Sequence, residues 1–197
     1  KVKLKHVQLN ENFKLIKQDL RDLKVLGNRF VNNEIVVFHG FDYYKSFVFN
    51  NLSKNCTSVW MLWGAEVYNN PEIVKRNILY GSSTLSNFIV VSHNAKIVEI
   101  IKNSFRQLFY IIKNQTDSPQ KLVLKAIRKV NYCGILYKEE FDFIQNKSVS
   151  NIKYLKFSYY PLELMMKNMG ARVMNDNILL GNSASATNNH LEAFELL

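Results

Sequence analysis

The stretch that decides the fold is Val59-Trp60-Met61-Leu62-Trp63-Gly64-Ala65-Glu66-Val67-Tyr68. An apolar run stops there at a tryptophan, a glycine and an acid, as a buried strand does when it delivers side chains to a cleft. Two other runs end in the same way: Ile35–Phe38 leads into His39-Gly40, and Asn177–Leu180 leads into Gly181-Asn182-Ser183. Such strand ends predict an α/β sheet with a site along one edge.

Outward from this stretch, strands and helices alternate along the chain. Short apolar runs predict strands at Val2–Leu9, Glu34–Phe38, Thr57–Leu62, Phe88–Val91, Tyr132–Tyr137, Ile152–Phe157 and Ile178–Leu180. Helical spacing predicts helices at Phe13–Leu26 with a stop at Gly27, Asp42–Leu52, Pro71–Tyr80, Ala95–Lys113, Pro119–Lys129, Glu139–Ile144 and from about Asn188. We therefore expect parallel strands, right-handed crossovers and a doubly wound Rossmann-like sheet, with strands such as Glu34–Phe38 buried on both faces.

Composition narrows the class of protein. The 197 residues, 47% of them hydrophobic, suffice for one full domain and part of a second. The net charge of +10 predicts an anionic partner: nucleic acid, acidic lipid or a phosphorylated ligand. We expect Cys56 and Cys133 to be small core residues in a reducing, cytoplasmic setting. No signal peptide begins the chain, and no apolar run approaches the roughly 20 residues that span a bilayer.

Three titratable residues follow predicted strands directly and are candidates for acid–base chemistry. His39, Glu66 and His93 each lie just past a strand end, and parallel strands bring such positions to one rim. A partly buried histidine or glutamate can act as a general base near neutral pH. The alternative is structural: Glu66 caps the next helix, and His39 satisfies a backbone carbonyl.

The loop Gly181-Asn182-Ser183 before the helix near Asn188 is a candidate phosphate site. Glycine allows close approach to a ligand, and N–H groups at a helix start favour phosphate oxygens. An ordinary strand-to-helix turn with a cap is the alternative. The loop does not match the P-loop, and no G-x-G-x-x-G or Asp-x-Asp occurs, which disfavours nucleoside triphosphatase, NAD and metal-bound nucleotide-sugar sites. We expect no metal and no cofactor.

Two further features carry alternative interpretations. Trp60 is expected in the core, whereas Trp63 at the strand end is the better candidate to stack on a sugar or a base. The helix Ala95–Lys113 has an apolar stripe and basic flanks. We favour packing of that stripe on the core, with a helix lying on an anionic bilayer as the alternative.

Taken together, these motifs resemble a known family. Phe38-His39-Gly40, Trp60-x-x-Trp63-Gly64-Ala65-Glu66-x-Tyr68, and Ile178–Ser183 with Asn188-x-His190 are similar to the dTDP-N-acetylfucosamine:lipid II N-acetylfucosaminyltransferases. The resemblance spans Ile35 to Leu197 and is loose between Asn69 and Asp176. Glu66 stands where a relative has aspartate, which leaves a carboxylate in place.

The resemblance implies a GT-B architecture, in which two Rossmann-like domains enclose the active site. Residues 1–165 would form the acceptor-side domain without its first elements, 166–176 a connector, and 177–197 the start of the donor-side domain. The resemblance implies roles for the following residues: Glu66 and His39 in catalysis; Trp63, Gly64, Tyr68 and Gly40 in substrate binding; Gly181, Asn182, Ser183 and Asn188 in phosphate binding. The place of His93 at a strand end adds it to the expected substrate-binding residues. Basic residues would attract lipid headgroups or the acceptor diphosphate: Lys102, Arg106, Lys125, Arg128 and Lys129.

The implied reaction is transfer of an N-acetylfucosamine-like deoxyamino sugar from a nucleotide diphosphate, with dTDP expected, to a polyprenyl-diphosphate-linked saccharide. The enzyme would lie peripherally on the cytoplasmic face of the inner membrane, in contact with anionic lipid and not with nucleic acid. The fragment alone is expected to be inactive. A basic α/β module that binds nucleic acid is the alternative, and a non-catalytic subunit that presents a lipid-linked substrate is a third.

Overall fold

Four short apolar runs pair into one parallel sheet. The computed structural model describes residues 14–74, 80–88, 93–158 and 190–196. The strands are β1 (Ile35–His39), β2 (Thr57–Met61), β3 (Tyr132–Ile135) and β4 (Lys153–Lys156), in the order β1-β2-β3-β4. All three pairings are parallel. The predicted α/β class with a Rossmann-like parallel sheet is therefore confirmed.

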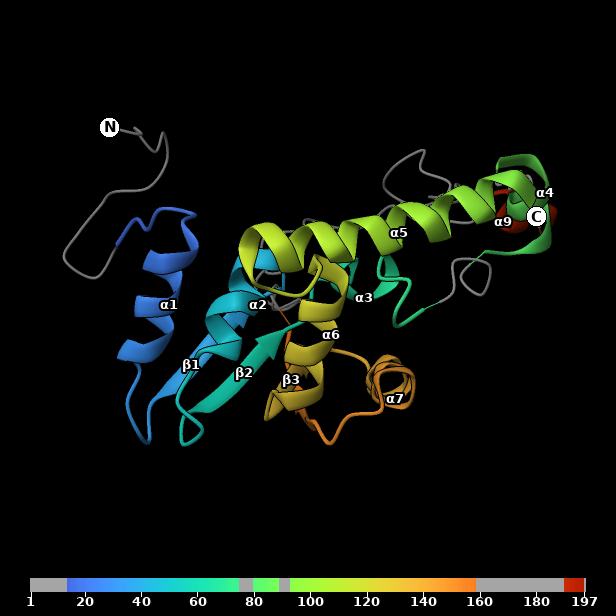
Figure 1. The fold of residues 1–197 in the computed structure, drawn as a ribbon. Coiled ribbons are helices and arrows are strands. Elements are labelled where there is room, and N and C mark those ends of the chain that lie inside the picture. The colour runs from blue at the N-terminus through green and yellow to red at the C-terminus, as the bar shows by residue number, and fades with distance from the viewer. Residues whose placement is uncertain (1–13, 75–79, 89–92, 159–189, 197) are drawn as a thin grey trace, which may run out of the picture.

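Four of the described helices pack on the same face of the sheet, and neighbouring ones contact each other. They are α1 (Leu20–Arg29), α2 (Tyr43–Asn50), α6 (Pro119–Lys129) and α7 (Lys138–Ser148), and Figure 1 shows α1, α2 and α6 next to one another along the strands. Because the strand order increases steadily, right-handed crossovers place every connecting helix on the same side. The expected doubly wound arrangement is therefore not found among the described residues.

The covered face of the sheet forms the core. Trp60 and Cys133 are wholly buried there, and both cysteines are free and buried, as predicted. The other face is open: Ile35 is 69% exposed and Val37 49%. The prediction that β1 is buried on both faces is wrong, because all described crossovers run on one side.

Helix α1 differs from the prediction at both ends. It begins at Leu20 rather than Phe13, because the Asp19 side chain accepts hydrogen bonds from the N–H groups of Arg21 and Asp22. Gly27 is not its stop but a buried position inside it. A Cβ at Gly27 would lie 2.8 Å from the carbonyl oxygen of Val48, so the glycine permits close packing of α1 on α2.

Between β2 and β3, the regular elements of the described residues are all helices. They are α3 (Ala65–Tyr68), α4 (Ser82–Phe88), α5 (His93–Asn114) and α6. Pro71 begins a turn and not the predicted helix, and Phe88 belongs to α4 and not to a strand. Helix α9 (His190–Glu195) lies against α4 at the far end of α5 in Figure 1.

Several predictions fall outside the described residues. These are the strand at Val2–Leu9, the rest of the predicted strand after Phe88, the strand at Ile178–Leu180, and both domain boundaries. The short helix predicted at Glu139–Ile144 is present and longer, as α7. Among the helices that the structure describes, none combines the length and apolar character required to cross a bilayer.

Helix α5 presents its apolar stripe to solvent. The described residues of the predicted stripe, Ile101, Phe105, Leu108 and Ile112, are exposed, and so are Phe109 and Ile111 beside them. The favoured interpretation, in which this stripe packs on the core, is therefore wrong for the described part of the helix. Figure 1 shows α5 as the long helix that runs past the rest of the domain toward α4.

Candidate functional site

Two glycines turn the chain at the carboxyl ends of β1 and β2. Gly40 has a φ of +67° and Gly64 a φ of +95°, values that residues with a side chain rarely adopt. A Cβ at Gly40 would lie 3.0 Å from Cδ1 of Trp63 and 3.5 Å from Oε1 of Glu66. The two strand ends therefore meet, and they bring Gly40, Trp63 and Glu66 together.

Glu66 is buried and holds this meeting point in place. It is 9% exposed, and its Oε1 accepts a hydrogen bond from Nε1 of Trp60 at 2.9 Å and one from the backbone N–H of Trp63 at 3.1 Å. Hydrogen bonds to an ionised acceptor are stronger than neutral ones. The carboxylate thus fixes the position of Trp63; its catalytic role stays a prediction.

The two histidines occupy different environments. His39 ends β1 on the open face of the sheet, and its carbonyl oxygen accepts a hydrogen bond of 2.6 Å from Nζ of Lys45. His93 begins α5, and its side chain lies outside the described part of the chain. The structure therefore leaves the predicted roles of both histidines as predictions.

A cavity of about 520 Å³ opens at the carboxyl ends of β2, β3 and β4. Such volumes are typical of small-ligand sites, and ligands of parallel sheets bind at this edge. Trp63, Gly64 and Tyr68, three of the predicted substrate-binding residues, line it. The other lining residues are Leu62, Ala65, Asn69, Gly134, Ile135, Leu136, Tyr137, Glu140, Phe157 and Ser158. Trp63 is 64% exposed, so its indole is available to a ligand.

Tyr68 and Glu140 form a hydrogen-bonded pair in the wall of this cavity. The Tyr68 hydroxyl donates to Oε1 of Glu140. Burial, and then the Glu140 carboxylate, raise the pKa of the Tyr68 phenol well above its usual value, so that Tyr68 remains the donor. The pair combines a fixed O–H group with a carboxylate that has one oxygen outside this bond. Such a pair can orient a sugar hydroxyl and accept its proton.

The sequence argument missed Glu140, although the rule that found Trp63 applies to it. The residues that follow β3, Leu136 to Glu140, lie at the same edge of the sheet as the end of β2. The predicted strand extends to Tyr137, whereas β3 ends at Ile135, so the prediction does not place the first turn of α7 at the edge of the sheet. Phe157 and Ser158 follow β4 in the same manner.

The described basic residues Lys125, Arg128 and Lys129 do not line this cavity. The candidate phosphate site, with Gly181, Asn182, Ser183 and Asn188, lies outside the described residues. Lys125 pairs with Asp117 at 2.5 Å, and Nε of Arg128 donates to the carbonyl oxygen of Ser148. Arg128 and Lys129 instead line a hollow of about 290 Å³ at the amino ends of β2 to β4. They lie at the edge of the sheet opposite to the cavity, and their predicted attraction for headgroups or a diphosphate stays a prediction.

Comparison with known proteins adds no further constraint. A scan against protein-family models matches none of them, and searches of curated proteins and of solved structures find no similar protein. Within the described ranges, no three His, Cys, Asp or Glu side chains gather closely enough to hold a metal ion. The cavity at the carboxyl edge therefore carries the functional argument alone.

Proposed function

We propose that this chain forms the acceptor-side domain of a glycosyltransferase of the GT-B type. It would transfer a deoxyamino sugar of the N-acetylfucosamine kind from a nucleotide diphosphate to a polyprenyl-diphosphate-linked saccharide. The family that the motifs resemble suggests dTDP as the nucleotide. The transfer would take place at the cytoplasmic face of a membrane, to which the protein binds peripherally.

The observation that carries this proposal is the exposed indole of Trp63 beside the Tyr68–Glu140 pair in one cavity. Carbohydrate ligands present apolar C–H faces, which stack on aromatic rings, and hydroxyl groups, which require directed acceptors. The largely apolar lining of the cavity, with the indole of Trp63, suits the C–H faces. The carboxylate of Glu140 is an acceptor for the hydroxyl groups. Glu66 supports the site from behind, since it fixes the backbone of Trp63.

In the proposed reaction an acceptor hydroxyl oxygen attacks the anomeric carbon of the donor sugar, and the bond from that carbon to the nucleotide diphosphate breaks. The hydroxyl proton passes to a carboxylate, for which Glu140 faces the cavity. Glu66 and His39 are the candidates that the motif resemblance supplies. Positioning of the hydroxyl by Tyr68 and Glu140 accounts for the acceptor half of the site.

Binding of an acceptor analogue tests the proposal directly. The probe is a water-soluble, short-chain polyprenyl diphosphate that carries an N-acetylated disaccharide, titrated calorimetrically into the 197-residue chain. We expect Trp63→Ala to weaken binding about tenfold, the equivalent of about 1.4 kcal/mol. Phe194→Ala is the matched control, because it removes another exposed ring, on α9, and should leave binding unchanged.

Transfer assays on the full enzyme then separate the three candidate bases. Glu140→Gln, Glu66→Gln and His39→Gln are compared at saturating acceptor, and the base is the residue whose loss lowers turnover at least tenfold. Two results would contradict the proposal: equal affinity of the wild-type chain and Trp63→Ala, or tight binding of oligonucleotides that weakens steeply with salt. The second result would favour the nucleic-acid-binding alternative.

A further inference from the structure

Helix α5 is attached to the rest of the domain through its polar side. Oε1 of Gln107 accepts a hydrogen bond of 2.9 Å from the N–H of Ser118, and Nε2 of Gln107 donates to Oδ1 of Asp117 at 3.2 Å. Nδ2 of Asn114 donates to the hydroxyl of Tyr43 at 3.2 Å, and the ring of Tyr110 lies 5.2 Å from that of Tyr43. An ordinary surface helix packs its apolar side inward, so this helix is inverted.

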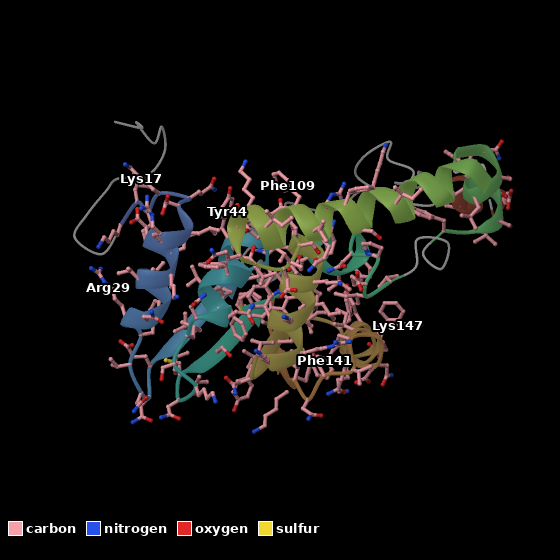
Figure 2. All side chains as sticks on the ribbon, in the orientation of Figure 1. Lys17, Arg29, Tyr44, Phe109, Phe141 and Lys147 are labelled. Atoms are coloured by element: carbon pink, nitrogen blue, oxygen red, sulfur yellow. The ribbon has the colours of Figure 1, made fainter. Side chains whose placement is uncertain are left out.

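The side that faces outward is apolar. Steps of four, three and four residues join Ile101, Phe105, Leu108 and Ile112 into one stripe, to which Phe109 and Ile111 add width. These side chains are between 48% and 72% exposed, and Figure 2 shows Phe109 on the outer side of the helix. Contiguous apolar exposure of this kind marks an interaction surface.

Basic residues border the stripe. At about 100° per residue, Lys102, Arg106 and Lys113 fall along one flank of it. Nζ of Lys113 lies 5.1 Å from the centre of the Phe109 ring, where the apolar and charged zones meet. Residues 101–114 contain no aspartate or glutamate, and the whole chain carries a net charge of +10. The surface is therefore complementary to a partner that is both apolar and anionic.

We propose that α5 lies in the surface of an anionic bilayer, with its 101–112 stripe among the acyl chains and Lys102 and Lys113 at the phosphate headgroups. An apolar stripe bordered by cations matches the boundary between headgroups and acyl chains. A protein partner would satisfy the stripe but leaves the basic border unexplained. This proposal assigns to α5 the peripheral membrane contact that the proposed function includes, and the observations behind it are independent of the transferase reaction.

The helix also lies at the functional end of the sheet. Tyr43, which holds the C-terminal end of α5, is the first residue of α2 and follows the carboxyl end of β1 closely. The cavity opens at the carboxyl ends of the neighbouring strands. A bilayer under α5 therefore lies toward the edge where a lipid-linked ligand would arrive.

Vesicle co-sedimentation of the 197-residue chain tests the proposal. The chain is expected to bind vesicles of phosphatidylcholine with phosphatidylglycerol, and to bind phosphatidylcholine vesicles much more weakly. The double variant Phe105→Glu/Ile112→Glu should lower the partition coefficient tenfold or more, because it removes two large apolar side chains from the acyl region and places carboxylates there. Lys102→Gln and Lys113→Gln should each lower it about fivefold, the equivalent of about 1 kcal/mol.

The matched control is Val25→Glu with Lys24→Gln, which makes one change of each kind at exposed positions of α1 and should leave binding at the wild-type level. Equal vesicle binding by the stripe variant and the wild type would overturn the proposal, as would failure of the wild type to bind anionic vesicles. Self-association in ultracentrifugation that Phe105→Glu/Ile112→Glu abolishes, without vesicle binding, would assign the stripe to a contact between copies. Binding of the soluble acceptor analogue should stay unchanged in the stripe variant, which separates this test from that of the proposed function.

Discussion

Replacement of Glu66 by alanine should destabilise the protein by about 3 kcal/mol. The substitution removes the acceptor of two hydrogen bonds, from Nε1 of the wholly buried Trp60 and from the N–H of Trp63. A buried donor left without a partner costs about 1–3 kcal/mol, and a hydrogen bond to a charged group contributes about 1.5–3 kcal/mol. The desolvation of a carboxylate that is only 9% exposed offsets part of this sum.

The conservative variant makes the prediction specific. Glu66→Gln keeps an oxygen acceptor where Oε1 lies, while it removes the charge and replaces Oε2 by an NH2 group, so we expect a loss of about 1 kcal/mol. Urea denaturation followed by far-ultraviolet circular dichroism gives both values, provided that the slope against urea concentration stays constant. Glu139→Ala is the control, because it removes an exposed acid from the first turn of α7 and should change stability by less than about 0.5 kcal/mol.

A double-mutant cycle isolates the bond to the indole. Trp60→Phe removes the donor, and its combination with Glu66→Ala should recover a coupling of about 1 kcal/mol or more. Two results would refute the reasoning: a stability of Glu66→Ala within about 0.5 kcal/mol of the wild type, or equal losses in the alanine and glutamine variants. Either would mean that the carboxylate does not hold the strand ends together.

Side-chain burial and close packing predict the stability of two further variants and the reactivity of one thiol. Gly27→Ala should destabilise the protein by about 1–3 kcal/mol, although alanine favours helices, because its Cβ would lie 2.8 Å from the Val48 carbonyl oxygen. The control is Asn28→Ala at an exposed position of the same helix, which should stabilise the protein by a few tenths of a kcal/mol. Thermal denaturation compares the two variants. Ser46→Ala should stabilise by about 1 kcal/mol in the same assay, because the buried hydroxyl of Ser46 has no hydrogen-bond partner; a loss of stability would contradict this. Burial raises the pKa of the Cys133 thiol to about 12, so iodoacetamide at mildly alkaline pH should modify this thiol only after the protein unfolds. Labelling of the native protein at the rate seen in urea would exclude that burial. Since the folded pKa is raised, this thiol favours the folded state fully at neutral pH, and its contribution declines as the pH rises above about 8.5, where the unfolded thiol ionises.

The strands were predictable because burial of their backbone requires continuous apolar runs. β1 and β2 begin within one residue of the predicted positions, and Pro119 marks the start of α6 as its restricted φ suggests. What the runs do not specify is which face each helix covers. That choice depends on the strand order, so the exposure of Ile35 was not evident from its apolar neighbours.

Tertiary contacts also account for the other differences. Gly27 has the features of a helix stop in the sequence, but the neighbouring helix α2 uses it for close packing. The stripe of α5 predicts an amphipathic helix correctly, yet only the hydrogen bonds of Gln107 and Asn114 determine that the polar side faces inward. At the site, the positions after strand ends were predictable, whereas the pairing of Tyr68 with Glu140 joins segments far apart in the chain.

The long connection between β2 and β3 has an evolutionary consequence. Met61 pairs directly with Gly134, so β2 and β3 are adjacent in the sheet although a long segment of chain separates them. The entropy of closing a flexible loop grows only logarithmically, by about 0.6 kcal/mol for each doubling of its length. Insertions and deletions around α4 would therefore be nearly neutral for folding, and this part of the chain can diverge rapidly while the strands are conserved.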